Sequence, residues 1–233
     1  MVRRKQAAAA LGKKRRSTSS RSELEAALKR AKGLDMGRGG AQYNMERRLV
    51  QLPFGREIEN SVRLRLEKAR HQPIIVLDKG AGSGNVSKDI KMLASSNDRG
   101  RISITAISLT NNIAPRNAAF IEERLIGAGI RADYGKKFDV IIDGFAEDYH
   151  LPKSFQLRSI EKSISELKNG GELFTVLPLV YEENEHGLTV EEGKSFVRAL
   201  KKFKGLKVRV QELRKRFDRK EYVDLVLHVT KTF

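Results

Sequence analysis

The residues best suited to chemistry form a glycine-rich turn directly after an apolar segment. The segment 73–78 ends in Asp78, and the turn that follows reads Lys79-Gly80-Ala81-Gly82-Ser83-Gly84. Glycines at alternate positions let the backbone approach a ligand closely and open the next helix. The dinucleotide pattern G-x-G-x-x-G is absent, because Asn85 or Ser87 stands where its last glycine would be. The turn therefore predicts a ligand site that is not of the dinucleotide type.

Further polar residues follow later apolar segments, namely Ser108, Asp133 and Asp143. In an open parallel sheet, ligands bind beyond the carboxyl ends of the strands. We therefore expect these residues at one edge, together with Asp78. Asp143 is the candidate for contacting a reacting group or for taking its proton. The alternative is that Asp143 only caps the loop after its strand.

Composition excludes several kinds of chemistry. The chain has no cysteine, which removes disulfides, thiolate metal sites and cysteine nucleophiles, and only 4 histidines. We expect no metal site. No apolar run approaches the ~20 residues of a membrane-spanning helix, so we expect no membrane partner.

Apolar segments alternate with amphipathic ones from residue 73 onward. The expected strands are 73–78, 102–107, 130–132, 138–143, 173–177, 206–213 and 222–230. The expected helices are 83–96, 115–126, 154–167 and, after the capping box Thr189–Glu192, a segment to about 203. This order predicts an α/β fold: a Rossmann-like, mostly parallel sheet with a C-terminal antiparallel hairpin and helices on both faces.

The segment VLDKGAGSGNVSKDI resembles the first motif of the class I S-adenosylmethionine-dependent methyltransferases. The resemblance continues in order through FDVIID (138–143), LKNGGELFTVLP (167–178) and the closing hairpin, and covers residues 73–231. It implies a methyltransferase domain, at 73–233, with S-adenosyl-L-methionine as cofactor.

The resemblance also implies roles for individual residues. Gly80, Ala81, Gly82 and Gly84 correspond to the turn that contacts the methionine moiety and ribose, with Asp78 ordering it. Asp133 matches the contact to the adenine amino group.

The second expected strand departs from the family pattern. Ser108 stands where the family has an acid that binds the ribose hydroxyls, and Asn111 or Asn112 is a candidate to compensate. Lys79 is also unusual within the turn, where it faces a phosphate or pairs with an acid.

The acceptor motifs of several methyltransferase classes are missing. Without cysteine, the covalent route to C5 of a pyrimidine is excluded. The tetrapeptide Asp143-Gly144-Phe145-Ala146 differs from the N/D-P-P-Y/F/W motif of enzymes that methylate base amines, and no lysine follows the fifth strand as a ribose 2′-hydroxyl enzyme requires. Phe145 and Tyr149 either stack on a base or pack the loop.

Positive charge is concentrated before residue 73. The net charge is +17, and residues 1–72 contribute +12 of it. Residues 1–21 are expected to form a disordered basic arm, and 22–72 a basic helical extension. Its elements are a helix after the capping box Ser22–Glu25, stopped at Gly33, and a second helical stretch, 42–70, broken near 53–55. The alternatives for the arm are a nucleic-acid-binding segment, a nuclear address, a mitochondrial transit peptide or a solvated basic tail with no dedicated role. Apart from the two addresses, we expect a cytoplasmic protein.

Acidic residues cluster beyond two strand ends instead (Glu147, Asp148, Glu182, Glu183 and Glu185). They would repel a phosphate backbone, which favours RNA held by residues 1–72 or an acceptor on a basic peptide. We expect a methyltransferase for RNA or an RNA-associated protein. The alternative is a catalytically weak or inactive methyltransferase fold that binds RNA or ribonucleoprotein.

Overall fold

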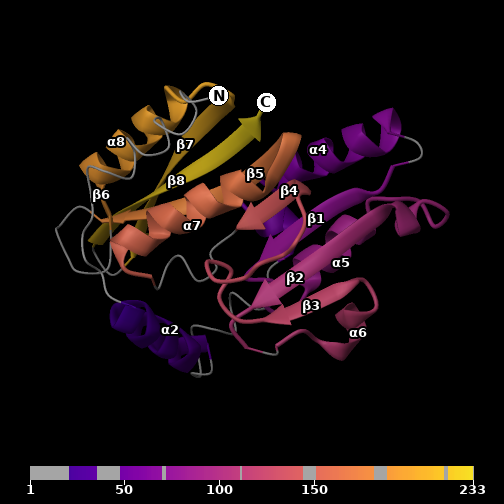
Figure 1. Ribbon diagram of the computed structural model, residues 1–233, viewed down its shortest axis with the longest axis horizontal. Coiled ribbons are helices and arrows are strands. Elements are labelled where there is room, and N and C mark those ends of the chain that lie inside the picture. The colour runs from indigo at the N-terminus through magenta and orange to yellow at the C-terminus, as the bar shows by residue number, and fades with distance from the viewer. Residues whose placement is uncertain are drawn as a thin grey trace.

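The computed structural model describes residues 21–35, 48–69, 72–110, 112–143, 151–180, 188–217 and 220–232. An eight-stranded sheet forms its centre, in the order β3-β2-β1-β4-β5-β8-β7 with β6 beside β5 (Figure 1). The strands are β1 Ile74–Lys79, β2 Ile102–Ser108, β3 Glu123–Ile126, β4 Phe138–Asp143, β5 Leu167–Val180, β6 Leu188–Thr189, β7 Leu206–Phe217 and β8 Lys220–Lys231.

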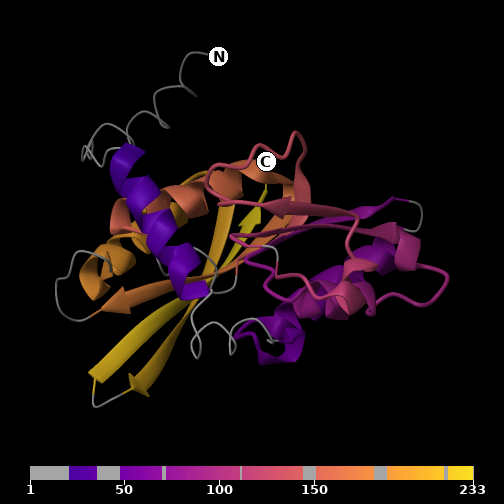
Figure 2. The same ribbon diagram turned by 90° about the horizontal axis from the view of Figure 1, so that it is seen from below.

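The first five strands run parallel, and β8 lies antiparallel between β5 and β7. The predicted fold is confirmed, including its C-terminal hairpin. Helices cover both faces, as Figure 2 shows from below: α4 Gly55–Lys68 and α5 Asn85–Lys91 on one, α7 Lys153–Glu166 and α8 Val190–Lys201 on the other.

Apolar alternation along the strands builds the two cores. Val76 and Val140 pack with Ile58 of α4, while Leu77 and Ile141 pack on the α7 and α8 side. Continuous apolar runs are therefore explained by burial on both faces. Because α4 shares a core with the strands, it is a layer of the sheet domain.

The predicted third strand is wrong. Residues 130–132 lie in a turn, and the strand is β3. The predicted helix 115–126 shrinks to α6, Pro115–Ala118, because the Glu122 amide already donates to the Ile104 carbonyl and starts the pairing with β2. As an edge strand, β3 buries little, so its apolar pattern was too weak to separate it from a helix.

Other boundaries shift by less. The helix predicted at 83–96 ends at Lys91, and the one predicted to stop at Gly33 is α2, Arg21–Asp35. Within 42–70, the break is confirmed between the 3-10 helix η1, Leu49–Gln51, and α4. A second 3-10 helix, η2, covers Arg99–Arg101. Gly170 and Gly171 lie inside β5, at a register shift against β4, instead of before it.

Candidate functional site

The glycine-rich turn joins β1 to α5 at the carboxyl edge of the sheet. Gly80, Gly82 and Gly84 have φ of 70°, 52° and 79°, a left-handed conformation that side chains disfavour. A Cβ on Gly84 would also lie 3.2 Å from Ile121. The amides of Gly80 and Ala81 donate to the Ile107 carbonyl at 2.8 and 3.1 Å, which fastens the turn to β2.

Asp78 lies beneath this turn and is buried. Its Oδ2 accepts a 2.6 Å hydrogen bond from the hydroxyl of Ser87 in α5. Burial raises the pKa of Asp78 to about 6, with the charge of Asp143 adding to the rise and hydrogen bonds from Ser87 opposing it. Asp78 therefore joins the end of β1 to the helix that the turn opens.

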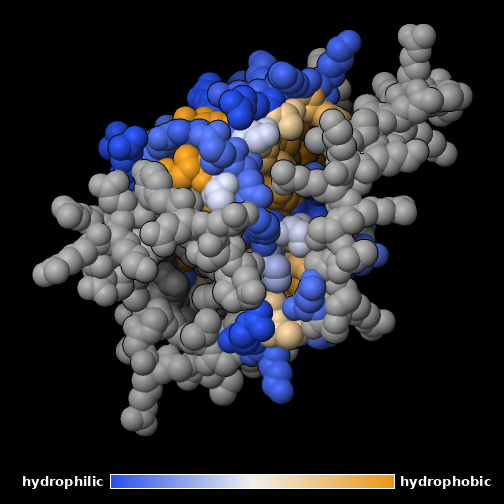
Figure 3. Space-filling view, turned by 90° about the vertical axis from the view of Figure 1, so that its left-hand side faces the viewer, coloured by the Kyte–Doolittle hydropathy of each residue, from blue (hydrophilic) through white to orange (hydrophobic). Residues whose placement is uncertain are grey.

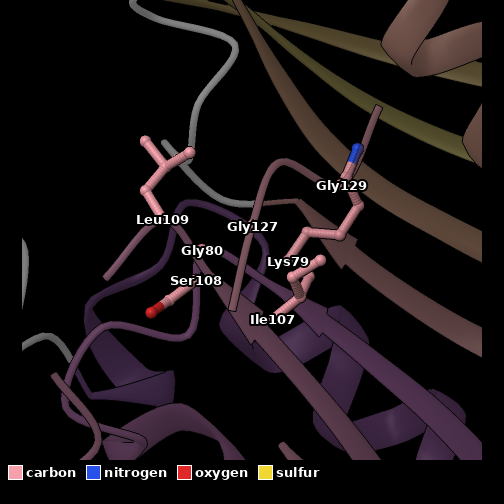
Figure 4. A pocket seen from close by; sticks show the side chains of 7 residues that line it. All are labelled: Lys79, Gly80, Ile107, Ser108, Leu109, Gly127 and Gly129. Atoms are coloured by element: carbon pink, nitrogen blue, oxygen red, sulfur yellow. The ribbon is translucent and has the colours of Figure 1, made fainter. Parts of the chain in front are cut away.

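Ser108 ends β2 beside the turn, but its hydroxyl is already used. It donates to the carbonyl of Thr110 in its own loop, and the Asn112 amide donates to the Thr110 hydroxyl. Figure 4 shows the side chains of Ser108 and Lys79 leaving the pocket in opposite directions. Asn111 lies outside the described residues. Ser108 thus stabilises the loop and offers a ligand only a neutral hydroxyl.

Asp133 does not directly follow the third strand, as its predicted role assumed. That strand ends at Ile126, and Gly127 follows it. The Asp133 carboxylate accepts a hydrogen bond from the Gly135 amide at 3.1 Å. Asp133 nevertheless lines the same groove as Ile126 and Gly127, so it remains at the predicted edge.

Asp143 is bound to Lys79 in a buried ion pair. Lys79 Nζ donates to Asp143 Oδ2 and to the hydroxyls of Ser159 and Ser163, at 2.8 and 3.1 Å. Of the two alternatives for Lys79, pairing with an acid is therefore correct. Asp143 Oδ1 is buried with no hydrogen-bond partner among the described residues.

The two serines of this cluster, Ser159 and Ser163, were not among the predicted site residues. They lie four residues apart on the buried side of α7, where apolar residues are expected, and that spacing was the available signal. Phe145 and Tyr149, like the five acids predicted to lie near this edge, fall in 144–150 and 181–187, outside the described residues.

Two neighbouring spaces with shared lining residues lie at this edge. A cavity of about 10 Å³ touches Lys79, Gly80 and Ser108, enough for about one water. A groove of about 570 Å³ shares Ile107, Leu109 and Gly127 with it. The groove has the volume of a small-molecule site.

The helix α2 forms one wall of this groove. Leu24 and Leu28 pack against Leu151 and Phe155 at the start of α7. Glu25, Leu28 and Lys29 line the groove, and Glu25 forms an ion pair with Arg131 at 2.8 Å. The N-terminal helix thus belongs to the site, which its position in the sequence did not reveal.

Across the described ranges, no group of three His, Asp or Glu side chains is placed to hold a metal ion. Among the helices in these ranges, none is long and apolar enough to cross a membrane.

No protein-family model and no curated protein matches the sequence. Solved structures do resemble it. One is the Burkholderia thailandensis 1,6-didemethyltoxoflavin-N1-methyltransferase with bound 1,6-didemethyltoxoflavin and S-adenosylhomocysteine. It is 16% identical in sequence, the match covers 92% of each chain, and the TM-score is 0.56. Another is the plantazolicin methyltransferase BpumL in complex with a pentazolic desmethylPZN analogue and S-adenosylhomocysteine: 15% identity, 91% of this chain, 98% of that one, TM-score 0.54.

A third is the N-methyltransferase NodS from Bradyrhizobium japonicum WM9 with S-adenosylhomocysteine: 15% identity, 91% of this chain, 100% of that one, TM-score 0.50. The chain has the fold of the class I S-adenosylmethionine-dependent methyltransferases. At these identities the likeness concerns the fold.

Asp78→Asn is expected to change how stability depends on pH. Because the folded-state pKa is raised, the unfolded chain ionises first, so wild-type stability falls as pH rises from about 4 to about 6. The full effect is about 3 kcal/mol, and the variant lacks it. Urea unfolding between pH 4 and 8 measures this difference. Asp98→Asn is the control, since hydrogen bonds from Ser95 and Arg101 lower the pKa of this exposed acid. Parallel wild-type and Asp78→Asn profiles would contradict the assignment.

Lys79→Met is expected to lower the free energy of unfolding by about 3–5 kcal/mol, because it leaves Asp143 as an unpaired buried charge. Lys79→Met with Asp143→Leu should recover most of this loss. Lys168→Met, which breaks the more exposed pair with Asp139, should cost at most about 1 kcal/mol. Chemical denaturation of the three variants tests the coupling, and additive losses in the double variant would argue against a direct pair.

Proposed function

We propose that the chain is an S-adenosylmethionine-dependent methyltransferase acting on RNA or an RNA-associated protein. The observation that carries the enzyme class is the left-handed glycine turn over Asp78 at the carboxyl edge of this sheet. Three of the similar structures contain S-adenosylhomocysteine, which is the product that remains when S-adenosylmethionine has transferred its methyl group.

The chain's own residues fit this cofactor at most points. Gly80, Gly82 and Gly84 hold the turn in a left-handed conformation, Gly80 lines the small cavity beside it, and Asp78 fixes the turn to α5 from below. Asp133 and the groove beside it are available to an adenine ring. The point of poor fit is Ser108, which offers no charge to a ribose. Bound S-adenosylmethionine would supply an electrophilic methyl group.

Transfer of a methyl group requires above all that the two reactants are held in line. The groove wall formed by α2 gives the chain a means to hold an acceptor and exclude water. Asp143 remains the candidate acceptor contact. Oδ2 is held by Lys79, and Oδ1, which is buried, is the carboxylate oxygen without a hydrogen-bond partner among the described residues.

Charge supports an RNA acceptor. The first 22 residues carry 8 basic and no acidic side chains. They lead into α2, which borders the groove, so the arm is attached next to the candidate site. By contrast, Arg48, Arg63 and Arg65 in the predicted basic stretch 42–70 form ion pairs with Asp89, Glu59 and Glu172. The arm is thus the better candidate of the two.

A second function is favoured by the two weak points of the site. Ser108 is committed to its own loop and Asp143 to Lys79. Both observations suit a methyltransferase fold that binds RNA or ribonucleoprotein with little or no catalysis. Binding of the cofactor separates the two functions.

Titration calorimetry with S-adenosylmethionine tests the enzyme. We expect micromolar affinity for the wild-type chain and none for Gly82→Val, because its side chain would enter the ligand's space. Gly170→Val is the matched control: Gly170 also has a positive φ, 76°, but lies in β5 near the opposite edge of the sheet. Circular dichroism confirms folding. No binding by the wild type at millimolar cofactor would support the non-catalytic function, and equal affinity in Gly82→Val would overturn the site.

Removing residues 1–21 tests the RNA partner. If the arm binds phosphates, truncation should weaken binding to all RNA sequences at low salt. The slope of log affinity against log salt should flatten by about 0.7 for each single-strand phosphate that the arm neutralises. Fluorescence anisotropy at several salt concentrations measures the slope, and cofactor affinity should not change. An unchanged slope would leave the arm as an address or an idle tail.

A further inference from the structure

A second concentration of positive charge lies where α8 ends and β7 begins. Residues 193–211 contain seven basic and no acidic side chains. Six neighbouring residues, all exposed, form what we call the α8–β7 basic corner: Arg198, Lys201, Lys202, Phe203, Lys204 and Lys207. Figure 3, which faces the end of the molecule where α8 lies, shows hydrophilic side chains along its upper rim.

The cations of this corner are not neutralised within the described part of the chain. None of them forms an ion pair there, whereas Lys194, one turn before Arg198, pairs with Glu212 at 3.5 Å. Most of the arginines on α4 also have acidic partners, as described above. Unpaired cations retain their full charge for an external polyanion.

The fold holds the corner rigidly and adds charge beside it. Phe196, Val197 and Leu200 anchor the inner face of α8 in the core, so Arg198 and Lys202 must point outward. Lys231 lies opposite Leu206 in the β7–β8 pair. Burial lowers the pKa of Lys231, and the nearby cation Lys137 lowers it further, so two more basic side chains lie at this edge.

Phe203 adds an exposed aromatic ring to the cations of the corner. Its side chain is 40% exposed, with Lys202 and Lys204 on either side. An exposed aromatic ring between cations suits a single strand, because an unpaired base stacks on the ring while its phosphates contact the lysines. In a duplex the bases are already stacked on one another and offer no free face.

The corner also lies away from the candidate site. The chain leaves the carboxyl edge at β6, and α8 carries it to the opposite edge, where β7 begins parallel to β5. A strand bound here would be anchored at a distance from the glycine turn and from the acids expected near it.

From these observations we infer that the α8–β7 basic corner is a binding surface for single-stranded RNA, separate from residues 1–21. The inference rests on the RNA partner of the proposed function, and it does not depend on catalysis. The corner provides a contact for the same polyanion that does not involve residues 1–21.

The test uses the full chain and a fluorescently labelled single-stranded RNA of mixed sequence. Lys202→Gln with Lys204→Gln should weaken binding about tenfold near 0.1 M salt and flatten the salt slope by about 1.4, because two phosphates are no longer neutralised. Arg116→Gln with Arg124→Gln is the matched control: it removes the same charge from exposed positions in α6 and β3 that form no ion pair within the described ranges. Phe203→Leu should weaken binding to the single strand at least about fivefold and leave a duplex of the same sequence nearly unaffected.

Three results would overturn the surface: an affinity of the Lys202/Lys204 variant within twofold of wild type at all salts, an equal loss in the control variant, or equal effects of Phe203→Leu on single strand and duplex. Loss of binding to phosphatidylserine vesicles with RNA binding intact would also overturn it, in favour of a membrane. S-adenosylmethionine affinity, measured in the same variants, distinguishes failure of the RNA surface from failure of the proposed enzyme. The cofactor affinity should be the same in all variants as in the wild type. If the wild type does not bind S-adenosylmethionine, that result contradicts the proposed enzyme and not the RNA surface.

Discussion

Two consecutive buried ionisable residues at the end of β1 impose the organisation of the whole carboxyl edge. Successive side chains of a strand point to opposite faces, so Asp78 and Lys79 each need a partner in a different layer. Asp78 finds Ser87 of α5, and Lys79 finds Asp143 of β4 with Ser159 and Ser163 of α7. The glycine turn begins immediately after this pair, so both helical layers are tied to the segment that would hold a ligand.

This arrangement costs stability where function is expected. An acid whose pKa is raised by burial destabilises the folded chain at neutral pH. A buried ion pair is at best weakly stabilising compared with apolar residues of the same size. Two such features directly before the glycine turn of the candidate site therefore indicate that these polar groups serve positioning more than stability. They hold β1, β4 and the layers around them in one register at the edge where chemistry would occur.

The parts of the fold that could be predicted from sequence are those where burial requires a clear pattern of apolar residues. The runs ending at Asp78 and Asp143 are buried on both faces, and both were placed correctly as strands. The edge strand β3 was missed because Arg124 and Ile126 face solvent, so the pattern around Leu125 did not distinguish a strand from a helix.

For the candidate site, the sequence pattern indicated candidate residues but not the interaction partners of their side chains. It predicted that four of them lie at one edge of the sheet, because each ends or directly follows an expected strand: Asp78, Ser108, Asp133 and Asp143. It could not show that Ser108 bonds to Thr110 or that Asp143 is held by Lys79, since those contacts depend on side-chain direction and on α7. The groove wall formed by α2 was also hidden, because a short helix far from the glycine turn in sequence carries no signal of where it docks.

The regional net charge was also a poor guide to the RNA-binding surface. A count of charges along the sequence does not show which cations are paired with acids in the folded chain. The stretch 42–70 is rich in arginine, yet Arg48, Arg63 and Arg65 form ion pairs with acidic residues of the same chain. The region after residue 73 is nearly balanced, yet residues 193–211 contain no acid, and the cations of the α8–β7 basic corner form no ion pair among the described residues. A polyanion responds to the charges left over after folding, and among the described residues the α8–β7 basic corner groups several such cations. For a chain of this fold, the surface that remains unpaired is thus a better guide to the partner than the segment that is richest in arginine.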